Sequence, residues 1–113
     1  MKQNRTKIGE FEELVLLVVG ILKDNAYGIS VMEEIEKQTG RFLTISAVHS
    51  VLTRLEKKGY LNSFMGGETN ERGGRRKRFF KLTGSGREAI NEVRKIRNKL
   101  WDIMPDLSME KRS

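Results

Sequence analysis

The feature that most constrains this chain is the order of segments between Thr44 and Leu82. A helix-length stretch, 44–59, leads into a short apolar segment, 60–65. A basic loop that begins with glycines follows, and a second short apolar segment, 79–83, closes the unit. A helix followed by a hairpin with a cationic tip can place one element in a groove of a nucleic acid while the other holds flanking phosphates. This combination points to DNA.

Within the helix-length stretch, four apolar residues lie at i, i+3, i+4 and i+7: Val48, Val51, Leu52 and Leu55. This spacing predicts a single buried stripe. The opposite side collects short or basic polar residues: Ser46, His49, Ser50, Thr53, Arg54 and Lys57. Short hydroxyl side chains let the backbone approach base edges, and a threonine methyl can contact a thymine methyl. We predict that these six residues contact DNA; the alternative is an ordinary solvated helix face.

The basic loop concentrates positive charge. From position 72 to position 81 there are six basic residues and no acidic one, whereas the segment 10–36 is acidic on balance. The pair Gly73-Gly74 favours a sharply bent hairpin. Because successive residues of a strand face opposite sides, only some of the cations can reach one partner. The predicted DNA contacts are Arg72, Arg75, Arg76 and Lys77. A solvated loop that maintains solubility is the alternative.

Helical and strand patterns on both sides complete an architecture. The predicted elements are, in order, helices over 10–23, 29–39 and 44–59, strands over 60–65 and 77–82, and a helix over 85–104. Gly40 is placed to end the second helix in the left-handed conformation, and Thr44 or Ser46 can cap the third. Helix, helix, helix, strand, wing, strand, helix is the winged helix-turn-helix plan. We therefore predict a mainly helical α+β fold.

The domain organisation follows from length and from the last helix. A chain of 113 residues forms one domain with a modest core. We assign 1–84 to a DNA-binding domain and 85–113 to a dimerisation helix with a short tail. Residues at heptad spacing over two repeats are predicted to form the dimer contact: Ala89, Val93, Ile96, Leu100 and Ile103. Two repeats are too few for a free coiled coil. They suffice for a helix that completes a dimer interface together with other elements.

Trp101, the only tryptophan, follows Leu100 of this stripe. Packing at the dimer contact is the simpler expectation. An indole beside a dimer cavity also suits a planar apolar effector, for which Met104 supplies an adaptable wall. We therefore retain Trp101 and Met104 as effector-binding candidates.

Composition restricts the class of protein. The net charge of +7 and pI near 9.9 favour a polyanionic partner. The apolar run 14–22 is too short to span a bilayer and no small-residue cleavage site follows it. We expect a cytoplasmic protein that does not bind membranes. One histidine, no cysteine and no carboxylate pair leave no catalytic or metal-binding set, so we expect no enzyme activity and no cofactor.

Four segments of the chain resemble the PadR family of bacterial transcriptional regulators. They are GEFEELVLL at 9–17, AYGI at 26–29, AVH at 47–49 with LTRLEKKGYL at 52–61, and RGGRRKRFFKLTGSG at 72–86. They span most of residues 9–88, and their order and spacing make the match specific. The short C-terminal region is similar to the compact branch of the family, which has a single C-terminal helix.

The resemblance implies a homodimeric regulator, usually a repressor, that binds double-stranded DNA at a pseudo-palindromic operator. The third helix is then expected in the major groove and the wing on the backbone or in the minor groove. Three residues depart from the family pattern, which usually has tyrosine at these positions: His49, Phe79 and Phe80. Loss of the phenols removes phosphate contacts, although His49 can still donate to a phosphate oxygen. An RNA- or ribosome-associated basic module and a protein-binding adaptor are the alternatives.

Overall fold

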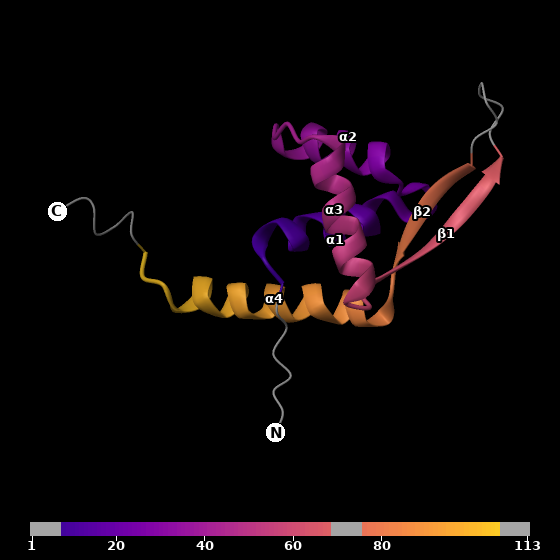
Figure 1. The fold of residues 1–113 in the computed structure, drawn as a ribbon. Coiled ribbons are helices and arrows are strands. Elements are labelled where there is room, and N and C mark those ends of the chain that lie inside the picture. The colour runs from indigo at the N-terminus through magenta and orange to yellow at the C-terminus, as the bar shows by residue number, and fades with distance from the viewer. Residues whose placement is uncertain (1–7, 69–75, 107–113) are drawn as a thin grey trace.

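A computed structural model of the protein describes residues 8–68 and 76–106 (Figure 1). The elements are, in order, α1 (Glu10–Leu22), the 3-10 turn η1 (Lys23–Asn25), α2 (Gly28–Thr39), α3 (Ile45–Lys57), β1 (Leu61–Glu68), β2 (Arg76–Leu82) and α4 (Gly84–Ile103). The first three helices form a group, the hairpin projects to one side of them, and α4 passes below (Figure 1). This arrangement confirms the predicted mainly helical α+β fold with a winged helix.

The hydrophobic core lies where α1, α2 and α3 meet the base of the hairpin. The stripe predicted on α3 is buried, with no member more than 3% exposed. The core residues of the helices and hairpin include Val15, Leu16, Val19, Val31, Ile35, Val48, Leu52, Leu55, Leu61 and Phe80. Full burial of one such aliphatic or aromatic side chain stabilises the fold by about 1.5–3 kcal/mol. The buried stripe therefore determines which face of α3 remains outside.

The ends of α2 and α3 follow local sequence signals. Gly40 ends α2 with a φ of 77°, and its N–H donates to the carbonyl of Glu36 at 2.8 Å. Of the two capping candidates for α3, Thr44 is the cap, since its Oγ1 accepts a hydrogen bond from the N–H of Ala47 at 3.1 Å. Thr44 thus determines where the exposed face of α3 begins.

The hairpin is longer than the sequence predicts. Its antiparallel pairing runs from Leu61↔Leu82 through Met65↔Arg78 to Glu68↔Arg76. The sequence predicts a first strand over 60–65, and a pair of glycines, Gly66 and Gly67, follows it. The structure continues the strand through them with a register shift, which is how glycine is commonly accommodated within a strand.

The buried contacts of α4 with the rest of the protomer lie in its first half, whereas Arg97 in its second half reaches α1 through an ion pair with Glu13. Thr83 caps the helix by accepting from the N–H of Gly86 at 3.0 Å, and Ala89 is 3% exposed. Every residue from Arg94 to Asp106 is exposed, and the C-terminal end of α4 extends beyond the helical group in Figure 1. The assignment of Ala89 to a dimer surface is therefore corrected: the residue is buried inside its own protomer.

Candidate nucleic-acid interface

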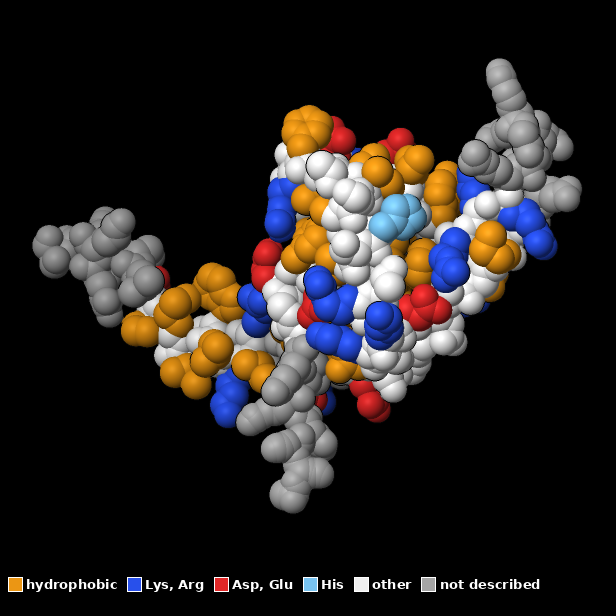
Figure 2. All heavy atoms as spheres, viewed as in Figure 1, with side chains coloured by type: hydrophobic (Ala, Val, Ile, Leu, Met, Phe, Trp, Pro, Cys, Tyr) orange, Lys and Arg blue, Asp and Glu red, His pale blue; other side chains and the backbone are white. Residues whose placement is uncertain are grey.

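The outer face of α3 presents the side chains that helical spacing predicts. All six are exposed to solvent: Ser46, His49, Ser50, Thr53, Arg54 and Lys57. The space-filling view shows largely uncharged side chains over this helix, with basic side chains near one end of it and along the hairpin (Figure 2). Hydroxyl groups can discriminate between bases, and the flanking cations attract phosphates.

The ring of His49 packs against the start of α2. A Cβ atom added at Gly28 would lie 2.7 Å from both Cε1 and Nε2 of His49, and 3.3 Å from Cδ1 of Ile45. Only a residue without a Cβ leaves room for the ring at this distance. The contact holds His49 at the junction of α2 and α3 while leaving it exposed. The sequence places Gly28 just before the helix predicted over 29–39, and nothing local in it reports a contact across 21 positions.

A buried carboxylate joins α1 to α3. Glu12 is 7% exposed and accepts hydrogen bonds from Nε of Arg54 at 3.0 Å and from Nζ of Lys58, which lies 3.0 Å from each carboxylate oxygen. The N–H of Gly9 donates a further bond at 2.9 Å. Burial alone raises the pKa of Glu12, but the Gly9 bond and the two cations outweigh burial and lower the pKa below its ordinary value of 4.5. Glu12 is therefore ionised at neutral pH.

Arg54 consequently has a role that its place on the helical wheel did not reveal. Spacing placed it at the margin of the DNA-contacting face, and its side chain is indeed 52% exposed. Its Nε nevertheless forms an ion pair with Glu12 on α1. Lys58, one helical turn later, pairs with the same carboxylate. One edge of α3 is thus tied to α1 by two ion pairs.

Polar contacts tie the other edge of α3 to the wing. Glu56, near the end of α3, accepts a hydrogen bond from Oγ of Ser63 on β1 at 2.6 Å. Arg78 on β2 donates to the same Ser63 oxygen at 3.0 Å and lies 3.7 Å from Oε1 of Glu56. These contacts set the position of the hairpin relative to α3. None of the three residues was among the predicted site residues.

Aromatic rings cover the opposite face of the hairpin. Phe79 stacks on Phe64 with ring centroids 5.7 Å apart, and it meets Tyr27 edge-on at 5.4 Å. Nζ of Lys77 lies 4.2 Å from the centroid of the Tyr27 ring, which is cation–π geometry. Lys77 is therefore held beside the start of α2, whereas Arg76 is exposed.

The predicted wing contacts are only partly within the described residues. Arg76 and Lys77 lie at the start of β2. Arg72 and Arg75 lie outside the part of the chain that the structure describes, so their assignment stays a prediction from sequence.

The exposed half of α4 bears most of the stripe predicted for dimerisation. Ile96, Leu100 and Ile103 are 52%, 59% and 66% exposed, and Val93 is half-buried. Contiguous exposed side chains of this size mark surfaces that proteins use for association.

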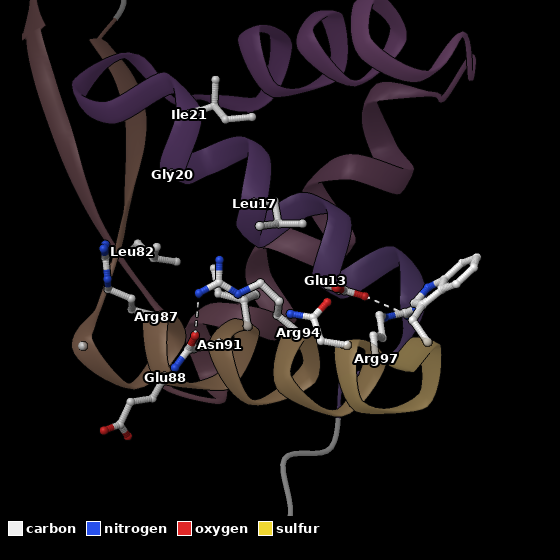
Figure 3. Close-up of a pocket in the computed structure, with 14 residues that line it drawn as sticks. Glu13, Leu17, Gly20, Ile21, Leu82, Arg87, Glu88, Asn91, Arg94 and Arg97 are labelled. Atoms are coloured by element: carbon white, nitrogen blue, oxygen red, sulfur yellow. Dashed lines mark hydrogen bonds and ion pairs between the residues drawn. The ribbon is translucent and has the colours of Figure 1, made fainter. Parts of the chain in front are cut away.

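A cavity of about 850 Å³ lies between α1 and α4 (Figure 3). Leu17 and Ile21 of α1 and Trp101 of α4 give it apolar walls. Trp101 is thus part of a cavity within one protomer, a position that its place beside Leu100 in the sequence did not predict. Met104 is not among the residues that line this cavity, and its contact with an effector at a dimer cavity stays a prediction.

Charged side chains also line this cavity, and two of them form an ion pair. Arg87, Arg94 and Arg97 line its α4 side, and Glu13 lines its α1 side. NH2 of Arg97 lies 3.0 Å from Oε1 of Glu13, an ion pair that joins the two helices (Figure 3). Glu13 is the neighbour of Glu12, so the first turn of α1 forms ion pairs with both α3 and α4.

Residues 8–68 and 76–106 contain neither a cluster suited to a metal ion nor a helix suited to crossing a membrane. Across these residues no group of three or more histidine, aspartate or glutamate side chains is arranged to hold a metal ion. In the same residues no helix has the length and apolar character needed to cross a membrane.

Several solved structures share this fold. A PadR-like transcription factor from Bacteroides fragilis has a TM-score of 0.66 at 20% identity, covering 82% of this chain and 84% of that one. A PadR family transcription regulator from Clostridium difficile R20291 has a TM-score of 0.67 at 20% identity, with coverage of 85% and 95%. One from Eggerthella lenta DSM 2243 has a TM-score of 0.63 at 24% identity, with coverage of 82% and 80%. At these identities the likeness concerns the fold.

Sequence comparison assigns the family. No curated protein is significantly similar to the chain in sequence. The model of the transcriptional regulator PadR-like family, however, matches residues 16–92, which run from the core of α1 through α3 and the wing into α4. The match therefore covers both the exposed face of α3 and the hairpin beside it. The chain belongs to the PadR-like family of transcriptional regulators.

Proposed function

We propose that the protein is a homodimeric repressor that binds a pseudo-palindromic operator in double-stranded DNA. The observation that carries this proposal is the outer face of α3, where serine, threonine and lysine side chains stay exposed beside a cationic hairpin. A DNA-binding dimer that occupies an operator represses most simply by blocking polymerase. Family membership supports the regulatory role.

Some α3 side chains contact bases and others contact phosphates. Ser46, Ser50 and Thr53 read base edges in the major groove, because short hydroxyl side chains allow close approach. His49 and Lys57 contact flanking phosphates. The wing adds Arg76 and Lys77, together with Arg72 and Arg75 on sequence grounds.

A second copy of the chain completes the molecule. We place it on the exposed half of α4, where Ile96, Leu100 and Ile103 are 52%, 59% and 66% exposed, so that it lies beside the cavity between α1 and α4. Burial of Ile96, Leu100 and Ile103 provides the association free energy. A two-fold axis through this contact presents two α3 helices to successive major grooves, about 34 Å apart.

The cavity between α1 and α4 is the proposed effector site. Its apolar walls, which include Trp101, suit a planar apolar compound. Such a ligand releases the operator only if it favours one spacing of the two α3 helices over another. Quenching of the single tryptophan's fluorescence by candidate compounds, followed by loss of operator binding, tests this part of the proposal.

Two variants test which α3 side chains contact phosphates and which contact bases. K57A should weaken binding to every duplex and reduce the salt slope by roughly one, because one phosphate contact is lost. S50A should instead change the preference at one base pair by about 1–3 kcal/mol. Equal behaviour of both variants on specific and random duplexes would contradict the proposal. Preference for structured RNA over duplex DNA in competition would favour the RNA-associated alternative.

A further inference from the structure

The ion pairs of Glu12 engage two cations at one margin of the exposed face of α3. Arg54 and Lys58 are four positions apart on α3, and both bond the same carboxylate within 3.0 Å. A carboxylate that is 7% exposed and ionised is costly to bury without such partners. The contact therefore holds both cations against α1 as well as compensating the buried charge.

We propose that Glu12 is a positioning residue that withholds Arg54 and Lys58 from DNA phosphates and thereby limits nonspecific binding. The inference rests on the proposed function, since it requires α3 to approach a duplex. Nonspecific affinity grows with the number of phosphates that cations neutralise, and it carries no sequence information. Each cation held by Glu12 therefore lowers binding to random DNA without affecting the base contacts of the hydroxyl face.

The geometry explains why these two cations are the ones withheld. On a helical wheel, Ser46, Thr53 and Lys57 form the centre of the exposed face, and Arg54 lies at the margin nearest α1. Without Glu12, the long side chains of Arg54 and Lys58 can swing around that margin toward the backbone of a duplex bound to α3. Lys57, at the centre of the face, is not restrained in this way and serves as a phosphate contact.

The same turn of α1 also fixes this arrangement relative to α4. Glu13 is 16% exposed and pairs with Arg97 at 3.0 Å. Adjacent carboxylates thus join one rigid helix end to α3 on one side and to α4 on the other. The position of the withheld cations is therefore set by the body of the protomer rather than by α3 alone.

The experiment measures the dependence of random-duplex binding on salt for the full chain and for Glu12→Gln. Glutamine keeps the shape of the side chain but removes the charge. For each released cation that reaches a phosphate, the log–log slope should steepen by about 0.9, so the total change should be roughly 1–2. A fourfold rise in salt then costs about 3.5-fold more affinity per released cation.

Two further variants separate release of cations from the loss of a negative charge. E36Q removes the same charge from α2, where Glu36 is exposed and forms no ion pair among the described residues, and it should keep the wild-type slope. In E12Q/R54A/K58A the released cations are absent, and the slope should return to that of the wild type. Melting curves confirm that each variant is folded.

The outcomes distinguish this inference from the proposed function. If the wild type binds duplex DNA and the salt-dependence slopes of E12Q and wild type are equal, the role of Glu12 is overturned. The proposed function is then left intact. Absence of salt-dependent duplex binding by the wild type overturns both. If E12Q does not fold, the NMR chemical shift of the Arg54 Nε–Hε group is measured in the wild type with and without duplex DNA. An unchanged chemical shift supports retention of Arg54 by Glu12, and a large change contradicts it.

Discussion

Replacing Leu100 by alanine tests whether the exposed half of α4 forms the dimer contact. Leu100 is 59% exposed in the protomer, so more than half of its surface remains for a partner to bury. Complete burial of a leucine is worth about 1.5–3 kcal/mol, which leaves about 1–2 kcal/mol per copy for the contact. Two-fold symmetry doubles the effect, so L100A should weaken the dimer by about 2–4 kcal/mol. The dimer dissociation constant should rise by about 30- to 1,000-fold.

Sedimentation equilibrium over a dilution series measures this change directly. K95A is the matched control, because Lys95 is exposed on the same helix but lies on the side away from Leu100. Alanine favours helix at least as well as leucine or lysine, so neither substitution should unwind α4. Operator binding by L100A should weaken at protein concentrations where the variant is monomeric.

The result that would refute the reasoning is a dissociation constant for L100A within a few-fold of the wild-type value. The exposed stripe of α4 would then lie outside the interface, and the proposed arrangement of the two α3 helices would be wrong. A similar loss of dimer in K95A would show that the effect arises from the helix as a whole.

Two further predictions concern the supports of α3. In G28A the added Cβ would lie 2.7 Å from the end of the exposed His49 ring, so the ring should rotate away. We expect stability to change by about 0.5 kcal/mol or less and DNA binding to weaken; DNA binding equal to that of the wild type would contradict a role for this contact. Because the pKa of Glu12 is lowered in the folded protein, its stabilising contribution is complete above the ordinary value of 4.5 and is lost as the pH falls through the folded-state pKa. Urea unfolding from about pH 6 to about pH 3 should show wild type and E12Q converging in acid, and a constant difference between them would oppose this assignment.

The exposed face of α3 could be predicted because its signals are local. Residues at 100° intervals report which face of a helix is buried, and Val48 and Leu52 lie inside as that spacing requires. Thr44 caps the helix from three positions before Ala47, a separation that sequence patterns capture. The order of elements likewise determined the winged-helix fold.

The contacts that support α3 could not be predicted because their partners are distant in sequence. Glu12 meets Arg54 and Lys58 across 42 and 46 positions, and a single sequence contains no periodic pattern at such separations. Glu12 itself reads as one of three acidic residues that favour a helix start. Its pairing depends on how α1 crosses α3 in the folded core.

The C-terminal helix shows a second limit of sequence reasoning. Ala89 and Leu100 share one heptad pattern, yet Ala89 is buried in its own protomer and Leu100 is exposed. Periodicity identifies an apolar face but does not identify which molecule covers it. Trp101 likewise lines a cavity with α1, because the path of α4 across α1 determines what it faces.

The measurement that tests the central claim most directly is selection of bound sites from a random duplex library with purified protein at moderate salt. A homodimer that reads bases with two α3 helices should enrich an inverted repeat whose half-sites are centred about one helical turn apart. Salt-sensitive binding without any enriched sequence would contradict the claim, because it would show a protein that contacts phosphates but reads no bases.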